Sequence, residues 1–362
     1  MKKIFLNSVV SCDMEEIFEG NVDWACLNEC TILITGATGM LASYMTYFLI
    51  FLNKMKNINV KIIAQIRNKE KAKKVFFDLF NEKCINFVNF DLLDEVNLDE
   101  SIDYIIHAAS LASPQYYTTC PVEVAEPNAI GTYNLLKFAE KKKVKGFLLF
   151  STGDIYGDVR GEQKVFEETM GYADPLYIHS CYNESKRMAE TWCKTFFYEK
   201  KVPTKIARIW HTYSPTMDIE NDPRVFASFV KCVIDNKNIE MLSEGRQTRT
   251  FCYITDAIVG FFLILFSGKD GEAYNICNTE ECYSIREIAE IVQKNSIKSD
   301  TVVVCKKRNK NDVYLENKTY GDMVPQNSKL KELGWNCKVN CNMGFSRVIK
   351  KFREDEKNEN II

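Results

Sequence analysis

Short apolar runs alternate with longer helical patterns through the first 210 residues of the chain. The apolar runs predict strands at residues 31–34, 60–66, 86–90, 104–107, 146–150 and 204–209. Between them, helical periodicity predicts helices at residues 40–54, 69–80, 121–142 and 182–200. Strands that alternate with helices are typical of a parallel sheet covered on both faces. The pattern therefore predicts an α/β fold over residues 31–210, with the doubly wound parallel sheet of a Rossmann domain.

The pattern changes after residue 210, where loops become longer and the predicted elements less regular. Helices are predicted at residues 224–236 and 285–294. We expect residues 211–350 to form mainly a smaller C-terminal substrate-binding lobe, with some elements returning to the sheet, because a cleft between two lobes is a common substrate site. Residues 1–30 are expected to be an N-terminal extension, helical near residues 14–19, and residues 351–362 a charged tail.

Composition excludes several classes of protein. A formal net charge of -2 over 362 residues gives no sign of a nucleic-acid-binding surface. The apolar segment at residues 40–52 is too short to span a bilayer and carries Ser43 and Thr46. The fourteen cysteines include no Cys-x-x-Cys pair, so we interpret them as reduced thiols rather than as disulfides or metal ligands. We expect a cytoplasmic protein without nucleic-acid, membrane or metal partners.

A glycine-rich turn joins the first predicted strand to the helix that follows it. Gly36 allows a tight turn, and Gly39 lets the backbone approach a phosphate, which then meets the free amides of the helix N-terminus. Strand, glycine turn and helix in this order predict a site for the pyrophosphate of a dinucleotide. The turn residues expected to contact this cofactor are Gly36, Thr38, Gly39, Met40 and Leu41.

Tyr182 and Lys186 share one face of a predicted helix, because they are spaced i to i+4. An ammonium beside a phenol lowers the phenol pKa from about 10, so the tyrosine can remove a hydroxyl proton while hydride leaves the carbon. Thr152, at the end of a predicted strand, can share the same substrate oxygen. The same spacing starts at Tyr133 and Tyr314, about as often as chance predicts. Only Tyr182 follows a Ser-Thr strand end by about thirty residues and also lies downstream of the glycine turn.

Further motifs lie at residues 91–92, 107–110, 128–132, 151–158, 208–215, 249–256 and 274–278. With the glycine turn, Tyr182 and Lys186, they resemble the extended short-chain dehydrogenase/reductase family of nucleotide-sugar epimerases, dehydratases and decarboxylases. The segments at residues 107–114 and 180–187 are most similar to UDP-glucuronate decarboxylases. The resemblance implies a Rossmann domain with a C-terminal lobe, a nicotinamide cofactor, a nucleotide-sugar substrate and a homodimer.

The resemblance also implies roles for single residues. Asp91 and Leu92 would contact adenine, and Lys186 would hold the nicotinamide ribose. The other residues implied to bind the cofactor are Ala108, Ala109, Ser110 and Asn128. Arg249 would bind the sugar-nucleotide diphosphate, a contact that suits a planar guanidinium. The other residues expected at the substrate are Ser113, Thr152, His179, His211 and Arg224.

Three departures from the family pattern bear on the reaction. Dehydratases carry Asp-Glu and decarboxylases Ser-Glu where this chain has Gly153 and Asp154. Gly153 has no proton to give, and Asp154, one methylene shorter than glutamate, is a candidate base with a loop or N-cap role equally open. His211 replaces an asparagine. The stretch at residues 321–325 lacks an arginine that the decarboxylases carry.

A fourth departure concerns the cofactor. The end of the second predicted strand, residues 64–68, has no acidic side chain for a ribose 2′-hydroxyl. Arg67 can instead pair with a 2′-phosphate, so NADP stands beside NAD. We favour NAD, because enzymes of this family usually recycle it.

The leading interpretation is an enzyme that oxidises a nucleotide-linked sugar at C4, most like UDP-glucuronate decarboxylase. Its expected catalytic residues are Tyr182, Lys186, Thr152 and Asp154. C4 epimerisation and NADPH-dependent reduction of a 4-keto sugar need only the tyrosine, lysine and threonine, so both remain alternatives. A non-catalytic dinucleotide-binding sensor or scaffold is the alternative from another class, and the presence of all three residues argues against it.

Overall fold

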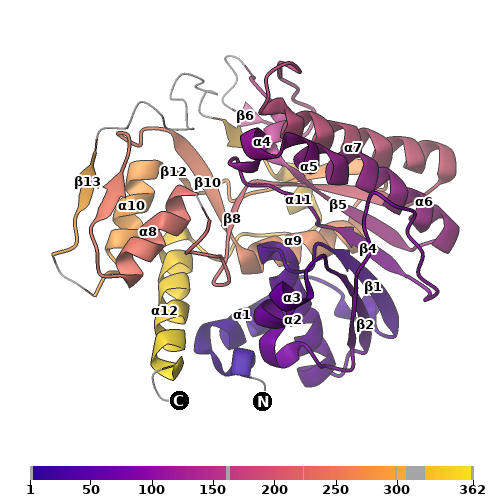
Figure 1. The fold of residues 1–362 in the computed structure, drawn as a ribbon, viewed down its shortest axis with the longest axis horizontal. Coiled ribbons are helices and arrows are strands. Elements are labelled where there is room, and N and C mark those ends of the chain that lie inside the picture. Colours follow the sequence, from indigo (N-terminus) through magenta and orange to yellow (C-terminus); the bar gives the residue numbers. More distant parts are fainter. Residues whose placement is uncertain (1–2, 160–163, 223, 298–299, 307–322, 360–362) are drawn as a thin grey trace.

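Seven parallel strands form the central sheet of the computed structural model, which describes residues 3–159, 164–222, 224–297, 300–306 and 323–359 (Figure 1). The strands are β1 (Cys30–Thr35), β2 (Val60–Gln65), β3 (Ile85–Val88), β4 (Tyr104–His107), β5 (Gly146–Thr152), β7 (Thr204–Ile209) and β11 (Glu272–Ile276). Their order is β11-β7-β5-β4-β1-β2-β3, and every neighbouring pair is parallel. The predicted doubly wound Rossmann sheet is confirmed, and its strand order reverses between β1 and β4, where such sheets bind ligands.

Apolar side chains of the strands pack alternately on the two faces of the sheet. On β1, Ile32 and Ile34 belong to one buried cluster, whereas Leu33 belongs to the other. Successive side chains of a strand point to opposite faces, so a strand covered on both sides is apolar along its whole length. The short continuous apolar runs of the sequence are therefore the strands of a core with two sides.

Helices cover both faces of this sheet. One face carries α2 (Met40–Met55), α3 (Lys69–Phe76) and α9 (Ile254–Ser267). The other carries α5 (Pro121–Glu126), a π-helical turn over Pro127–Gly131, α6 (Thr132–Lys142) and α7 (Ser180–Lys200). The helix predicted at residues 121–142 is thus divided into three segments, because Pro127 lacks the N–H group that would continue the α-helical ladder.

A smaller lobe, on the left of Figure 1, is built from chain beyond residue 210. Its strands are β8 (His211–Tyr213), β10 (Thr248–Tyr253) and β12 (Cys282–Ser284) in one sheet, with β9 (Ile239–Met241) and β13 (Val303–Cys305) as a parallel pair. Its helices are α8 (Val225–Ile234), α10 (Ile285–Gln293) and α12 (Cys341–Glu359). Short elements elsewhere are α4 (Tyr116–Thr119), β6 (Lys164–Val165), β14 (Val324–Pro325) and α11 (Ser328–Glu332). From this half of the chain, α9 and β11 return to the main sheet.

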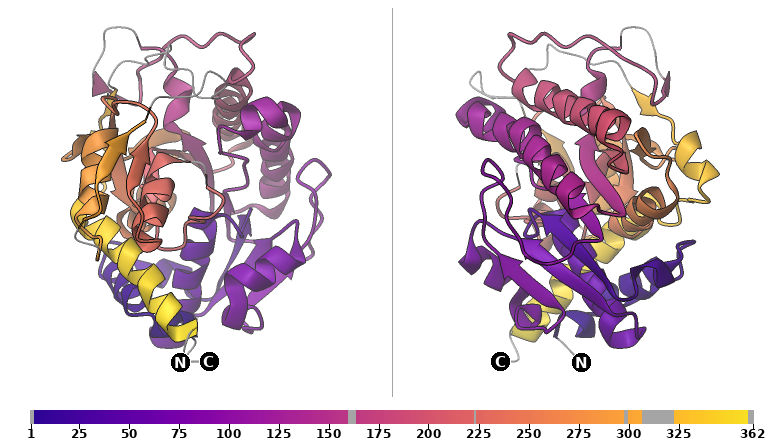
Figure 2. Two further views of the ribbon diagram at one scale, coloured as in Figure 1. Left: turned by 60° about the vertical axis from the view of Figure 1, so that its left-hand side comes forward. Right: turned by 90° about the vertical axis from the view of Figure 1, so that its right-hand side faces the viewer.

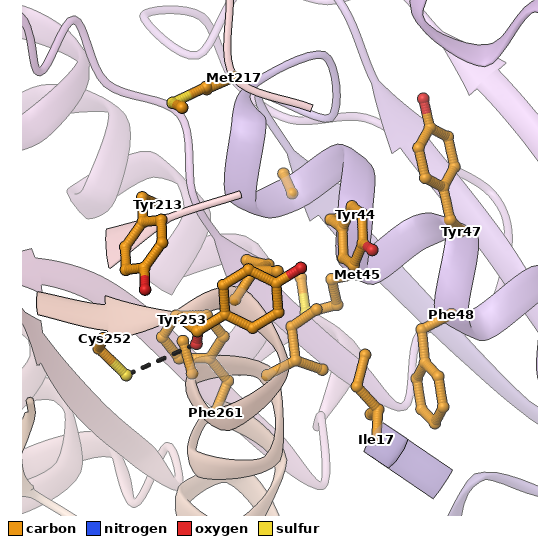
Figure 3. Close-up of a cluster of buried hydrophobic side chains, with 14 of the residues drawn as sticks. Ile17, Tyr44, Met45, Tyr47, Phe48, Tyr213, Met217, Cys252, Tyr253 and Phe261 are labelled. Atoms are coloured by element: carbon orange, nitrogen blue, oxygen red, sulfur yellow. Dashed lines mark hydrogen bonds between the residues drawn. The ribbon is translucent and has the colours of Figure 1, made fainter. Parts of the chain in front are cut away.

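The N-terminal extension is part of the core. Helix α1 (Ser8–Phe18) begins earlier than predicted, after Asn7, whose side chain accepts hydrogen bonds from two backbone N–H groups of the first turn. The helix packs against α9 and α12. Ile17 lies in the same buried cluster as Tyr44 of α2 and Tyr253 of β10 (Figure 3). The extension therefore contacts both the main sheet's helices and the smaller lobe.

A buried carboxylate on α1 connects three parts of the chain. Asp13, which has no exposed surface, accepts hydrogen bonds from the hydroxyls of Tyr44 (2.6 Å) and Tyr253 (2.7 Å). Its other oxygen accepts one from Arg347 of α12 at 3.0 Å. Arg347 also forms an ion pair with Glu16, at 2.7 Å. The extension thus ties α2, the helix after the glycine turn, to the last helix of the smaller lobe.

The segment expected as a charged tail is largely the end of α12, which continues to Glu359. Glu354 accepts hydrogen bonds from the backbone nitrogen of Ser8 at 2.9 Å and from its hydroxyl at 2.6 Å. Asn7 donates from Nδ2 to Asp355 at 3.0 Å. The charged residues of this segment are therefore not all solvated, because Glu354 and Asp355 accept hydrogen bonds from the start of α1. These contacts place the two ends of the described chain side by side (Figure 2).

In the described ranges, no helix combines the length and the apolar character needed to cross a membrane. The same residues contain no group of three or more His, Cys, Asp or Glu side chains that could hold a metal ion. All fourteen cysteines are described and are free thiols.

Candidate active site

The glycine turn lies at the carboxyl end of β1, directly before α2. Gly36 is left-handed, with φ of 62°, and accepts a 2.9 Å hydrogen bond from the backbone nitrogen of Gly39. Gly39 is the N-cap of α2 and has no side-chain acceptor, so the first N–H groups of the helix are available to an anion. Thr38, Met40 and Leu41 are partly exposed around this turn. The local geometry is therefore compatible with the predicted pyrophosphate site.

Gly36 also makes a close approach to the next strand of the sheet. A Cβ atom on Gly36 would lie 2.6 Å from the Cα atom of Ala109, which follows β4. Ala109 donates its backbone N–H to the hydroxyl of Thr35 at 3.3 Å. The predicted cofactor-lining residues Ala108 and Ser110 therefore flank a residue that touches the glycine turn.

Gly36→Ala is expected to weaken NAD binding about tenfold or more and to lower the free energy of unfolding by about 1–3 kcal/mol. The added methyl group would strain the left-handed backbone and displace Ala109. Calorimetric titration with NAD and urea unfolding measure the two effects. Gly39→Ala is the comparison variant and should lose less stability, because its φ of -72° is ordinary and the added Cβ atom would meet only the Gly36 carbonyl oxygen, at 3.2 Å. Equal stability of the two variants would contradict the argument.

Gln65 holds the glycine turn from the adjacent strand, and the sequence analysis did not single it out as a site residue. Its buried side chain accepts a hydrogen bond from the backbone nitrogen of Gly36 at 2.9 Å and donates one to Phe90 O at 2.9 Å. The amide therefore fixes the turn relative to the end of β3. The available signal was a polar residue directly after the apolar run of residues 62–64.

The residues predicted to hold the adenosine half lie beyond the ends of β2 and β3. Arg67 and Asp91 are both exposed there. Asp91 accepts a hydrogen bond from the backbone nitrogen of Leu93 at 3.0 Å, which shapes its own turn. Leu92 is buried, and its Cβ atom would lie 3.1 Å from a Cβ atom added to Gly131. The structure thus offers two exposed charged groups and one apolar contact at this edge.

Buried polar atoms without hydrogen-bond partners among the described residues occur on the segment after β4 and on the π-helical turn at Pro127–Gly131. They include Ser110 Oγ and Asn128 Oδ1, while Asn128 Nδ2 donates to Val124 O at 2.9 Å and to Ser185 Oγ at 3.0 Å. Buried polar atoms normally have partners. Together with the uncapped start of α2, these atoms fit a bound dinucleotide that would satisfy them.

Tyr182 and Lys186 occupy one buried face of α7, next to the end of β5. Lys186 Nζ donates to Phe150 O at 2.8 Å, and the hydroxyl of Thr152 lies close enough to Tyr182 to act in the direction that lowers the pKa of its phenol. The ring of Tyr182 stacks on Tyr117 of α4, with centroids 4.8 Å apart. The structure therefore brings the predicted tyrosine, lysine and threonine together, and it adds Tyr117 as a supporting ring.

The predicted lowering of the Tyr182 pKa by Lys186 is not found in this structure. Burial raises the pKa of Tyr182, as does the negative charge of Asp154, whereas Thr152 and Arg224 act in the lowering direction. Burial lowers the pKa of Lys186 to about 7, which makes its ammonium a weak source of positive charge at neutral pH. Ionisation of Tyr182 therefore requires an additional positive charge in the site.

Polar residues from both lobes converge near Tyr182. Burial, together with the charges of Arg249 and Arg224, lowers the pKa of His211 to about 3, so the imidazole is neutral at pH 7. Asp154 is open to solvent on one side, yet the surrounding protein raises the pKa of its carboxyl, while Arg249 lowers it. His211 Nδ1 is buried and unpaired among the described residues. Two guanidinium groups and a neutral imidazole form an environment suited to a diphosphate.

Other contacts orient the two arginines. Arg224 pairs with Asp222, whose two carboxylate oxygens each lie 2.9 Å from Nε. Arg249 donates to Thr248 O at 2.7 Å and to Gln247 Oε1 at 3.1 Å. The guanidinium groups are therefore held before any ligand binds.

The remaining predicted substrate residues lie on the α4 side of Tyr182. His179 stacks on Tyr177, with ring centroids 4.9 Å apart, and meets Tyr117 edge-on at 6.1 Å. Ser113 has a buried hydroxyl that lacks a partner within the described part of the chain. Gly321 and Asp322, in the stretch that lacks the expected arginine, lie outside the described residues.

A tryptophan explains the glycine at position 153. A Cβ atom on Gly153 would lie 2.8 Å from Cδ2 and Cε2 of Trp210. Trp210 is held by a 3.1 Å hydrogen bond from Nε1 to Asn275 and by stacking on Tyr156 at 5.8 Å. The indole occupies the space that a side chain at position 153 would need.

Comparison with known proteins agrees with this architecture. UDP-glucuronic acid decarboxylase 1 of Arabidopsis thaliana is 31% identical over 330 residues, which cover 91% of this chain and 71% of the relative. The solved UDP-glucose 4-epimerase of Thermotoga maritima superposes with a TM-score of 0.74 at 22% identity, covering 90% of this chain and 99% of that one. The solved UDP-glucuronic acid 4-epimerase of Bacillus cereus superposes with a TM-score of 0.72 at 22% identity, covering 90% of this chain and 99% of that one. The model of the NAD dependent epimerase/dehydratase family matches residues 32–277, more than half of the chain, and the chain belongs to that family.

Proposed function

We propose that this chain binds NAD and oxidises a nucleotide-linked sugar at C4, with UDP-glucuronate as substrate and release of CO2 as the outcome. The observation that carries this proposal is the meeting of Thr152, Tyr182 and Lys186 at the end of β5. The similarity to a UDP-glucuronic acid decarboxylase supports the choice of substrate. The sugar of UDP-glucuronate carries a carboxylate, and it can lose CO2 from this group once C4 is a ketone.

In the proposed reaction, Tyr182 removes the proton of the C4 hydroxyl, and Thr152 holds the same oxygen. A bound NAD would supply the hydride acceptor for C4 and a positive nicotinamide charge that favours ionisation of Tyr182. Lys186 orients the ribose beside this tyrosine. Asp154 lies close enough to influence Tyr182, and it is the proposed donor of the proton that replaces the carboxylate at C5 after CO2 has left.

The binding groups are assigned by position. We propose that Gly36 and Gly39 hold the pyrophosphate of the cofactor, with Ser110 and Asn128 satisfied by its nicotinamide half. Arg67, Asp91 and Leu92 stand at the adenosine end. On the substrate, Arg249, Arg224 and His211 are proposed to bind the diphosphate, and Ser113 and His179 the sugar side.

C4 epimerisation is the second candidate, and the packing of Gly153 favours it. Trp210 fills the space beside Gly153, so position 153 supplies no acid or base. Epimerisation needs only removal and return of hydride at C4 with the tyrosine, lysine and threonine. Under this alternative, UDP-glucuronate would change its C4 configuration and keep its carboxyl group.

A panel of UDP-, GDP-, CDP- and dTDP-sugars, incubated with the protein and with NAD or NADPH, tests the proposal. Mass spectrometry of the products should show loss of CO2 from UDP-glucuronate. An unchanged mass with a new C4 configuration by NMR would identify the epimerase. Gain of two hydrogens from NADPH would identify a reductase. Recovery of every sugar unchanged would refute catalysis.

Gly153→Ser is expected to destabilise the protein by about 1–3 kcal/mol, because the new Cβ atom must displace the Trp210 ring. The double variant with Trp210→Leu should lose less stability than the sum of the two single variants, since the smaller side chain makes room. Urea unfolding of the four proteins in this cycle measures the coupling. Strict additivity would show that the two side chains do not compete for space.

A further inference from the structure

Glu190 lies one helical turn beyond Lys186 on α7, and its carboxylate is anchored from the sheet. Arg208 of β7 donates to it from Nη2 at 2.7 Å and from Nε at 3.1 Å, and Ser151 of β5 donates from Oγ at 2.5 Å. Ser151 and Arg208 are paired in the register of the two strands. The Glu190 side chain is only 12% exposed. Its carboxylate is therefore held in one place beneath the catalytic face of the helix.

Lys186 needs such a counter-charge. It is 2% exposed, and the hydrogen bond from its ammonium goes to the neutral carbonyl of Phe150. Removal from water disfavours the charged form of a lysine unless an opposite charge lies nearby. Glu190 makes the largest contribution in favour of the charged form of Lys186, opposite in sign to the effect of burial.

We propose that Glu190 is a positioning residue whose anchored carboxylate, one helical turn from Lys186, increases the fraction of Lys186 that is an ammonium, the form proposed to hold the cofactor ribose. This role rests on the proposed function for its catalytic meaning, but the charge state of Lys186 can be measured without substrate. Because Glu190 acts through Lys186, its replacement should change proton chemistry and leave substrate binding in place.

The surroundings of Glu190 contain charges of both signs. Arg208 and the Ser151 hydroxyl meet it from the sheet, and Lys186 and the Cys193 thiol share its helix. Its other side borders a cavity of about 470 Å³. The further charged residues lining this cavity are Glu167, Glu168, Arg187, Lys194, Glu272 and Lys329. On the sheet side, His107 of β4 lies close enough to Lys186 for the lysine charge, in addition to burial, to lower the pKa of its imidazole.

The test measures the titration of Lys186 in full-length protein labelled with 13C at the lysine ε-carbon. The Lys186 signal is assigned by its absence in Lys186→Arg. In the unaltered protein its midpoint should lie near pH 7. In Glu190→Gln it should fall by about one pH unit, because an opposite charge is lost. A midpoint within about 0.3 unit of the original value would overturn the proposal.

Kinetics with the active sugar nucleotide give a second readout. In Glu190→Gln the alkaline limb of the kcat profile should move to lower pH by the same amount, with KM changed less than about twofold. Glu190→Asp keeps the charge and should restore most of the profile. Glu184→Gln, on the same helix and paired with Arg187, is the matched control and should change neither property.

The role of Glu190 can still be tested if Glu190→Gln does not fold or if no sugar nucleotide is turned over. If Glu190→Gln does not fold, Ser151→Ala removes one anchor while keeping the carboxylate, and it should lower the Lys186 midpoint in the same direction by a smaller amount. No shift in that variant would count against the proposal. If no sugar nucleotide is turned over, the proposed function fails, whereas the Lys186 titration still decides the role of Glu190 independently.

Discussion

Tyr182→Phe is expected to lower nucleotide-sugar turnover by about a thousandfold, while NAD binds with unchanged affinity. The phenol oxygen is the group that meets Thr152 at the end of β5, and phenylalanine removes only this oxygen. The ring should keep its stacking on Tyr117, so the fold of the site should persist. Product formation by mass spectrometry and NAD titration by calorimetry measure the two quantities.

A matched control exists elsewhere in the same chain. Tyr133 and Lys137 have the same spacing on α6, and the Lys137 ammonium lies 5.8 Å from the centre of the Tyr133 ring. Tyr133→Phe should leave turnover unchanged, because the Tyr133 ring packs on Trp192 and Phe196. The third pair, Tyr314 and Lys318, lies outside the described residues. Turnover that survives Tyr182→Phe would exclude the proposed proton transfer.

Asp13→Ala is expected to lower the free energy of unfolding by about 3–5 kcal/mol. The substitution would leave the Arg347 guanidinium without one of its two carboxylates and the buried hydroxyls of Tyr44 and Tyr253 without an acceptor. Urea unfolding measures the loss. Glu15→Ala, on the same helix, removes a partly exposed ion pair with Lys56 and should cost less than about 1 kcal/mol. Similar losses for both variants would contradict the role assigned to the buried network.

The pH dependence of Asp13 provides a sharper form of this prediction. Burial raises its pKa to about 6, against the lowering effect of Tyr44, Tyr253 and Arg347. Because the folded state binds this proton more tightly, the stabilisation is fully present below the unfolded pKa of about 3.9 and is lost as the pH rises through about 6. Relative to Asp13→Asn, the unaltered protein should lose about 2–3 kcal/mol between roughly pH 4 and pH 7. A difference that does not change with pH would refute this assignment.

The central sheet could be predicted because each of its inner strands is buried on both faces. The bounds of β4 and β7 agree with the predicted runs at residues 104–107 and 204–209. The start of α2 also agrees, because a glycine turn is a local signal. By contrast, the position of α1 depends on partners far along the chain. Its contact with Arg347 spans 334 residues, and no local pattern contains that information.

The site shows the same division between local and distant causes. Spacing on one helix places Tyr182 beside Lys186, and strand ends place Thr152 near both. The pKa of Tyr182 could not be derived in this way, since it depends on burial and on Asp154 from another segment. The contact of Trp210 with Gly153 was likewise hidden, because the two residues belong to different strand ends.

The contact between α1 and α12 has a consequence for synthesis of the protein. A ribosome makes α1 early, but Arg347, which pairs with Asp13, follows 334 residues later. At about 5–20 residues per second, this interval lasts from about 20 seconds to about a minute. Throughout that time the apolar side of α1 lacks the surface of α12 that covers it in the finished molecule. The nascent chain therefore completes its core only when its last helix has emerged.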